Sequence, residues 1–184
     1  LSEGTSPCHV SLGKEDQYLF ASYYHRGTIE SYPINVTTGQ IEEISSSIKH
    51  GDKEKKAHVH YASITPDRKF VVVVDLGLDK ICTYAFEHGI LKEKEQFLCE
   101  QGSGPRHLTF HPNGHIAYCM TEFSSEIYVL KYSQVEGSFK LIHKIRTIPD
   151  NFHENNQGSA IHITTDGKFV YAANRGHHSI AIFE

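Results

Sequence analysis

The chain has 184 residues, of which 39% are apolar and 22% are charged, and its formal net charge is −4. This length and composition suffice for one sizeable domain with a hydrophobic core. The slight acidic balance gives no basic surface of the kind that binds nucleic acid, and no apolar run approaches the roughly 20 residues that a helix needs to cross a bilayer. We therefore expect neither nucleic acid nor a membrane as a partner.

Four cysteines are spread along the chain without the C-x-x-C spacing of a metal or redox motif. Cys82, Cys99 and Cys119 lie in or beside apolar runs that resemble strands, so we expect them to be buried free thiols. Free thiols are typical of a reducing compartment, and the sequence therefore predicts a cytoplasmic protein.

One unit recurs four times along the chain, and its first landmark is a polar turn that runs into an apolar strand. The turn residues are spaced by 52, 46 and 53 positions, and an isoleucine farther along each unit keeps the same three spacings. Two landmarks that stay in register indicate a true repeat. The turn residues are Glu15, Asp67, Asn113 and Asp166, and the isoleucines are Ile29, Ile81, Ile127 and Ile180.

Each unit is expected to form four antiparallel strands in chain order. A short strand precedes the polar turn, the apolar strand follows it, and the isoleucine opens a third strand. The fourth strand is predicted at residues 40–44 in the first unit and at residues 138–142 in the third. Four-stranded units of about 40–50 residues are typical of propeller blades, with a β-sandwich or a β-solenoid as the alternative.

The predicted fold class is therefore all-β, a β-propeller with four-stranded antiparallel blades. Residues 1–184 are expected to form a single propeller segment with repeats at about 1–50, 51–100, 101–148 and 149–184. The fourth repeat reaches Glu184 inside its third strand. Because a propeller that does not close exposes sheet edges, we expect the chain to be a fragment of a longer protein.

The start of the first strand and the end of the second strand lie on the same rim of a propeller channel, since the two strands are antiparallel. Side chains at these positions in successive blades should converge over one mouth of the channel. The strand starts contribute His9, His60, Arg106, His107 and the stretch Ser159–His162, and the strand ends contribute Tyr23–Tyr24, Asp75–Leu76, Thr121–Glu122 and Asn174–Arg175.

Five segments carry a family resemblance, namely Gly102–Leu108, His111–Gly114, Ile148–Phe152, Ile161–His162 and Asn174–Phe183. They resemble the seven-bladed β-propeller lactonase family, which includes the propeller-type 6-phosphogluconolactonases and the carboxy-cis,cis-muconate lactonising enzymes. The resemblance covers essentially all 184 residues, and it implies a seven-bladed parent of which about four blades are present here.

The resemblance also implies an active site made of a histidine, a glutamate and two arginines. Its histidine motif corresponds to His58-Val59-His60, although the proline that usually precedes this motif is absent here. We favour His60 as the catalytic histidine because it adjoins the predicted first strand, with His58 beside it as a substrate-binding residue. The remaining three catalytic residues correspond to Arg106, Glu122 and Arg175.

These residue types suit the opening of a lactone, which needs an activated water and a stabilised tetrahedral oxyanion. A histidine, whose pKa is ordinarily near 6.5, suits the acid–base step, so His60 is assigned to it with help from Glu122. Arg106 and Arg175 suit the binding of a substrate phosphate or carboxylate, and either guanidinium could stabilise the oxyanion.

The predicted function is hydrolysis of 6-phosphogluconolactone or a related sugar lactone in carbohydrate metabolism (the pentose phosphate pathway), with no cofactor and no metal. The alternatives are a muconate-type lactonising enzyme and a non-catalytic propeller that binds a ligand. Each of these site residues could instead have a structural role. For Glu122 and Arg175 that role would be an ion pair with each other that stabilises the fold. His58 and His60 could belong to a metal site only with a third ligand, which the sequence does not assign.

Overall fold

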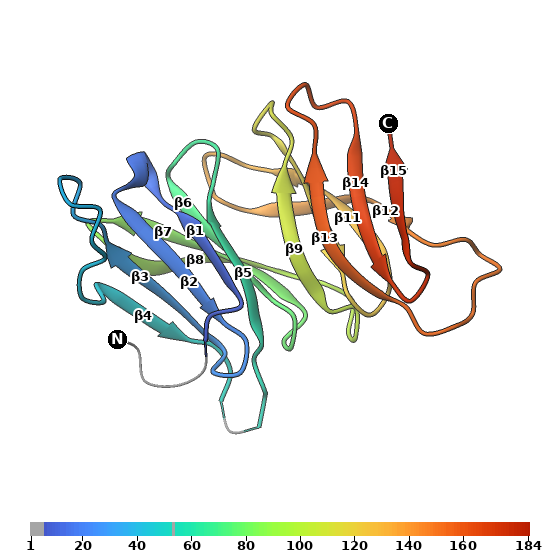
Figure 1. The fold of residues 1–184 in the computed structure, drawn as a ribbon, viewed down its shortest axis with the longest axis horizontal. Helices are drawn as coiled ribbons and strands as arrows, with labels where there is room; N and C mark the ends of the chain where they lie inside the picture. Colours follow the sequence, from blue (N-terminus) through green and yellow to red (C-terminus); the bar gives the residue numbers. More distant parts are fainter. Residues whose placement is uncertain (1–5, 53) are drawn as a thin grey trace.

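The computed structural model describes residues 6–52 and 54–184 and is built of antiparallel strands joined by turns. Its strands form four sheets, and Figure 1 shows the sheets following one another along the longest axis of the molecule. Among the described residues the only helical segment is a single 3-10 turn, η1 (Lys14–Asp16). The predicted all-β class is confirmed.

Every sheet is made of strands that are consecutive in the chain. The first sheet contains β1 (His9–Leu12), β2 (Tyr18–Tyr23), β3 (Thr28–Pro33) and β4 (Ser46–Lys49). The second contains β5 (Val59–Ile64), β6 (Phe70–Asp75), β7 (Lys80–Glu87) and β8 (Ile90–Leu98). The third contains β9 (Pro105–Phe110), β10 (Ile116–Thr121), β11 (Glu126–Tyr132) and β12 (Phe139–Arg146), and the fourth contains β13 (Gln157–Ile163), β14 (Val170–Arg175) and β15 (Ser179–Phe183).

The first strands of the four sheets lie next to one another, as the innermost strands of propeller blades do. Strand β1 contacts β5, β5 contacts β9, and β9 contacts β13. Figure 1 shows these four strands in this order across the middle of the molecule. Three four-stranded sheets and one three-stranded sheet thus form a segment of a β-propeller, as predicted.

The hydrophobic core lies between neighbouring sheets rather than inside any one of them. In β6, Val71 and Val73 pack toward the first sheet, whereas Val72 and Val74 pack toward the third. All four valines are fully buried. Because β6 is covered on both faces, its sequence is an unbroken apolar run instead of an alternating one.

The prediction of a fourth strand at residues 40–44 is wrong. Residues 40–44 contribute only an isolated bridge between Ile34 and Ile41, and the edge strand is β4, which follows them. The serine-rich sequence around β4 fits closely against the second sheet, where Ser45 Oγ donates a hydrogen bond of 2.9 Å to the carbonyl oxygen of Gly89. The strand predicted at residues 138–142 is confirmed as part of β12.

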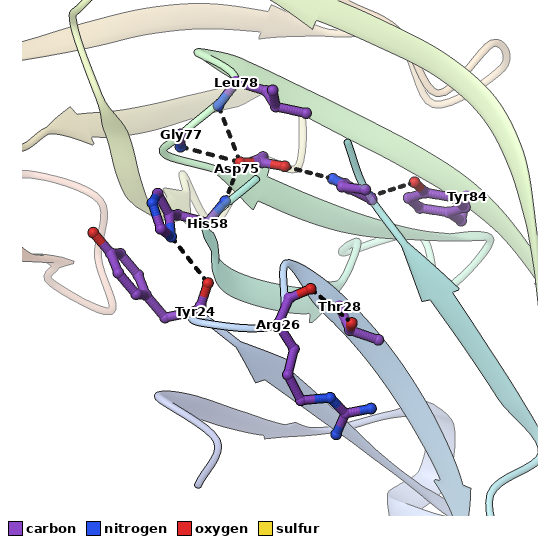
Figure 2. A network of polar contacts seen from close by, with 9 residues as sticks. Tyr24, Arg26, Thr28, His58, Asp75, Gly77, Leu78 and Tyr84 are labelled. Carbon is purple, nitrogen blue, oxygen red and sulfur yellow. Dashed lines mark hydrogen bonds and ion pairs between the residues drawn. The ribbon is translucent and has the colours of Figure 1, made fainter. Parts of the chain in front are cut away.

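A buried polar cluster around Asp75 holds the start of β5 against the end of β6 (Figure 2). Asp75 Oδ2 lies 2.8 Å from Nδ1 of His50, and Nε2 of His50 lies 2.7 Å from the hydroxyl of Tyr84. The other oxygen, Oδ1, accepts backbone N–H bonds from His58, Gly77 and Leu78. Burial alone would raise the pKa of Asp75, but these hydrogen bonds outweigh it and lower the pKa.

We expect Asp75→Ala to lower the free energy of unfolding by about 3–5 kcal/mol, because it leaves His50 and three backbone N–H groups buried without their acceptor. Denaturant unfolding of the purified protein measures this loss. The exposed Asp150, which pairs with Arg146, is the matched control, and Asp150→Ala should change stability by less than about 0.5 kcal/mol. Equal effects of the two substitutions would contradict the assignment.

Candidate active site

A local irregularity in the first strand of a sheet presents a side chain at the rim of the channel. In the second sheet the pairing passes from Val59 opposite Asp75 to Tyr61 opposite Val74, which leaves His60 unpaired. The third sheet has the same register shift, which leaves Arg106 unpaired. Bulges of this kind re-aim a side chain, and they set both residues at the position that the sequence predicted.

In the fourth sheet, the sequence left the rim residue open within the stretch Ser159–His162, and the strand pairing now identifies it. There the register shift lies between Gly158 and Ile161, so Ser159 occupies the place that corresponds to His60 and Arg106. His162 lies farther along β13 with an exposed side chain, and it is not part of the rim. Gly158 is required at this point, because a Cβ atom there would lie 2.1 Å from the carbonyl oxygen of Thr121.

The four residues assigned to catalysis line one pocket of about 330 Å³ at the mouth of the channel. All four sheets contribute to it. A hollow of about 350 Å³ lies between the third and fourth sheets, and one of about 550 Å³ lies on the outer face of the first sheet. Both have mostly apolar linings, and the described residues that line them include no comparable set of charged groups. The lining of the rim pocket consists of Ser6, Pro7, Cys8, Tyr24, His25, His60, Arg106, Glu122 and Arg175.

Glu122 lies between the two arginines of the pocket. Its Oε2 atom is 2.8 Å from Nε of Arg106 and 2.8 Å from a terminal nitrogen of Arg175. The Arg106 contact is an ion pair rather than a directed hydrogen bond. Glu122 and Arg106 are each 13% exposed and Arg175 is 48% exposed, so Arg106 is the inner cation and Arg175 the outer one.

A loop that is held by hydrogen bonds delivers Arg106 to this position. Asp79 accepts backbone N–H bonds of 2.7 Å from Gly102 and 2.8 Å from Gly104, immediately before β9 begins. Gly104 has a φ of +63°, and a Cβ atom there would meet the ring of Phe123 at 2.5 Å. The Gly-Ser-Gly-Pro-Arg sequence therefore serves to place the arginine, which explains its glycines.

His60 is an uncharged imidazole beside the inner arginine at neutral pH. Burial, together with the positive charge of Arg106, which acts in the same direction, lowers the pKa of His60 to about 4. Its Nδ1 atom is buried without a hydrogen-bond partner among the described residues. A neutral imidazole that borders a pocket keeps one unprotonated ring nitrogen, and such a nitrogen can accept a proton from a bound water within hydrogen-bond reach.

A second layer of rings lies beneath His60. The ring of His107 meets that of His60 edge to face at a centroid distance of 5.1 Å, and His9 lies 5.8 Å from His107. Burial lowers the pKa of His9 to about 4 and that of His107 to about 3, with Arg106 adding to both shifts. These two histidines are therefore neutral, and they line the channel below the pocket rather than the pocket itself.

His58 lies outside the pocket lining and supports it from behind. Its ring stacks on that of Tyr24 at 4.1 Å between centroids with an interplanar angle of 16°, and its Nδ1 lies 3.0 Å from the carbonyl oxygen of Tyr24. The expectation that His58 binds substrate is not supported by this position, because its ring is occupied by Tyr24. Tyr24, which the sequence placed at the rim, lines the pocket, and so does Cys8, which alignment of the repeats could have found.

The described residues include no group of three or more histidine, cysteine or acidic side chains placed to hold a metal ion. The same part of the chain has no helix long and apolar enough to cross a membrane. All four cysteines are free, with Cys82 and Cys119 buried, Cys99 half-buried and Cys8 exposed. Burial of the first three was predicted, and Cys8 at the pocket is the exception.

The repeated sheets and the charged pocket at their rim agree with one family model, described as lactonase, 7-bladed beta-propeller, which matches residues 1–184. The chain belongs to this family. The resemblance noted in the sequence is thereby confirmed, and so is its interpretation as part of a larger propeller.

A 6-phosphogluconolactonase of Bacillus subtilis is 44% identical over 188 residues, which cover 100% of this chain and 54% of the relative. A solved protein structure from Lactobacillus plantarum is 34% identical and superposes with a TM-score of 0.92, over 99% of this chain and 54% of that one. The periplasmic gluconolactonase PpgL of Pseudomonas aeruginosa, 23% identical with a TM-score of 0.85 over 97% of this chain and 56% of its own, shares the fold. The chain thus spans about half the length of these relatives.

We expect the imidazole of His60 to titrate near pH 4, and Arg106→Gln to move its pKa upward, because the substitution removes a positive charge that opposes protonation. Burial should keep the pKa of the variant below the ordinary value of about 6.5. NMR titration of the ring resonances measures both values. The exposed Arg146→Gln is the control and should leave the curve unchanged. A midpoint near 6.5 in the unsubstituted protein would contradict this description.

Proposed function

We propose that the full-length protein is a lactone hydrolase whose substrate is 6-phosphogluconolactone or a related sugar lactone. The observation that carries the proposal is the convergence of His60, Arg106, Glu122 and Arg175 on one pocket. The name of the Bacillus subtilis relative supports the choice of substrate. The four free cysteines support the cytoplasm as the compartment in which it acts.

The chemical step assigned to His60 is removal of a proton from the attacking water. The water oxygen then forms a bond to the carbonyl carbon of the lactone, and the carbonyl oxygen becomes an oxyanion. When the tetrahedral intermediate collapses, the bond between this carbon and the ring oxygen breaks. The departing ring oxygen takes the proton back from His60, so the products are a free carboxylic acid group and a hydroxyl.

The two arginines have different parts in this proposal because they lie at different depths. Arg106 is largely buried beside His60, which suits stabilisation of the oxyanion where water is excluded. Arg175 is half exposed at the outer edge, which suits binding of a phosphate on the far end of the substrate. With His60 neutral, the two guanidiniums and the one carboxylate leave one excess positive charge for an anionic ligand.

Glu122 is proposed to position the arginines rather than to act as a base. Both guanidiniums contact the same carboxylate oxygen, so this oxygen is engaged in two ion pairs. The sequence assigned Glu122 to assist His60 in activating water, and this geometry favours the narrower role. It also accounts for why a glutamate is needed at all in a pocket that binds an anion.

We expect the full-length protein to hydrolyse 6-phosphogluconolactone, and His60→Ala to lower kcat by about 10²–10⁴-fold, since it removes the acid–base group. Arg175→Ala should raise KM for the phosphorylated lactone far more than for gluconolactone. Hydrolysis is followed by the proton released, with correction for spontaneous ring opening. Arg146→Ala serves as the control outside the pocket.

Absence of hydrolysis with both lactones would overturn the proposed function. In that event, formation of a lactone from a muconate would favour the lactonising reaction. Binding of 6-phosphogluconate without turnover would favour a non-catalytic propeller. Loss of activity in Arg175→Ala that is equal for the two lactones would refute the assignment of Arg175 to the phosphate.

A further inference from the structure

Tyr24 enters the pocket from the first sheet, at the place that corresponds to Glu122 and Arg175 in the third and fourth sheets. It follows the last residue of β2, as Glu122 follows β10, and it is half-buried. Its ring meets that of His60 edge to face at a centroid distance of 5.6 Å. Tyr24 thus lies beside the proposed acid–base residue. It reaches the pocket from the first sheet, whereas Arg106 and Arg175 reach it from the third and fourth sheets.

The orientation of Tyr24 is fixed from behind by the buried cluster at Asp75. The ring of His58 stacks against it, and the backbone N–H of His58 donates a 2.9 Å hydrogen bond to Asp75 Oδ1. Figure 2 shows this arrangement, with the Tyr24 hydroxyl directed away from Asp75. A ring held in this way loses little conformational entropy when a ligand binds.

The hydroxyl of Tyr24 is a free hydrogen-bonding group in an otherwise charged pocket. No hydrogen bond to this hydroxyl is formed by any of the described residues, although the ring is held on two sides. Burial raises its pKa, and the negative charge of Glu122 raises it further, so the hydroxyl keeps its proton. It can therefore both donate and accept a hydrogen bond.

We propose that Tyr24 is a specificity-determining residue whose hydroxyl forms a hydrogen bond with a hydroxyl group on the ring of the substrate lactone. This inference rests on the proposed function. A neutral donor and acceptor suits a neutral sugar hydroxyl, whereas the phosphate and the oxyanion are served by the guanidiniums of Arg175 and Arg106. The residue would thereby distinguish polyhydroxylated sugar lactones from simple cyclic esters of the same ring size.

The test compares two substrates in the full-length protein and its Tyr24→Phe variant. Gluconolactone carries ring hydroxyls and δ-valerolactone carries none, while both present the same six-membered lactone. We expect Tyr24→Phe to lower kcat/KM for gluconolactone by roughly three- to tenfold, as the loss of one neutral hydrogen bond implies. The value for δ-valerolactone should stay unchanged, because phenylalanine preserves the ring and its stacking on His58. Tyr171→Phe, on β14 outside the pocket lining, is the matched control.

Each outcome decides the inference. A loss confined to gluconolactone supports it, whereas an equal loss on both lactones shows a structural role and overturns it, as does no change on either. If the unsubstituted protein hydrolyses no lactone, the proposed function fails separately. The inference is then decided by calorimetric binding of gluconate: weaker binding by Tyr24→Phe supports it, and equal binding overturns it.

Discussion

Antiparallel pairing between the first two strands of each sheet places two kinds of position at one rim of the channel. One is the residue at the start of the first strand, and the other is the last residue of the second strand or the residue directly after it. The register shift in β5 and β9 turns His60 and Arg106 toward the mouth, and the ends of β10 and β14 add Glu122 and Arg175. Residues more than a hundred positions apart in the chain meet because one backbone geometry is repeated.

Electrostatics gives the pocket its chemical character. Burial of cations is costly unless they are paired, and Glu122 pairs with both guanidiniums through a single oxygen. The same cations and the same burial keep His60 and His107 uncharged. When an anionic ligand offsets the charge of the arginines, the pKa of His60 should rise, so binding of the substrate would strengthen the base that acts on it.

The sequence repeat predicted the fold and most of the rim, because strand register follows from landmarks that recur at fixed spacing. The repeat gave a wrong prediction where side-chain contacts decide which of two neighbouring segments forms the strand. The isoleucines at residues 40–44 resemble an edge strand better than Ser46–Lys49 does, yet the serines fit against Gly89. It also left the start of β13 open to within a few residues, because a bulge shifts the register without changing composition.

Two further features could not come from spacing alone. Sharing of one Glu122 oxygen by two arginines depends on side-chain rotamers, and the repeat specifies only backbone positions. The displacement of His58 from the pocket by Tyr24 depends on ring stacking between two sheets. The motif His-x-His led to His60 as the preferred catalytic histidine and to His58 as a substrate-binding residue, but spacing alone does not specify that the ring of His58 stacks on Tyr24.

The outer faces of the first and fourth sheets bear on how complete the pocket is. Val10 and Leu12 on the first sheet and Ile180 and Ile182 on the fourth are half or more exposed, and contiguous apolar surface of this kind usually marks a face that another element covers. Members of the family have seven blades, and the chain spans about half the length of the relatives described above. Further sheets packed on these faces would bring their own rim positions to the pocket. Arg175, now the most exposed of the three ionic groups and borne by the fourth sheet, would then be partly enclosed, which would strengthen its attraction for an anion.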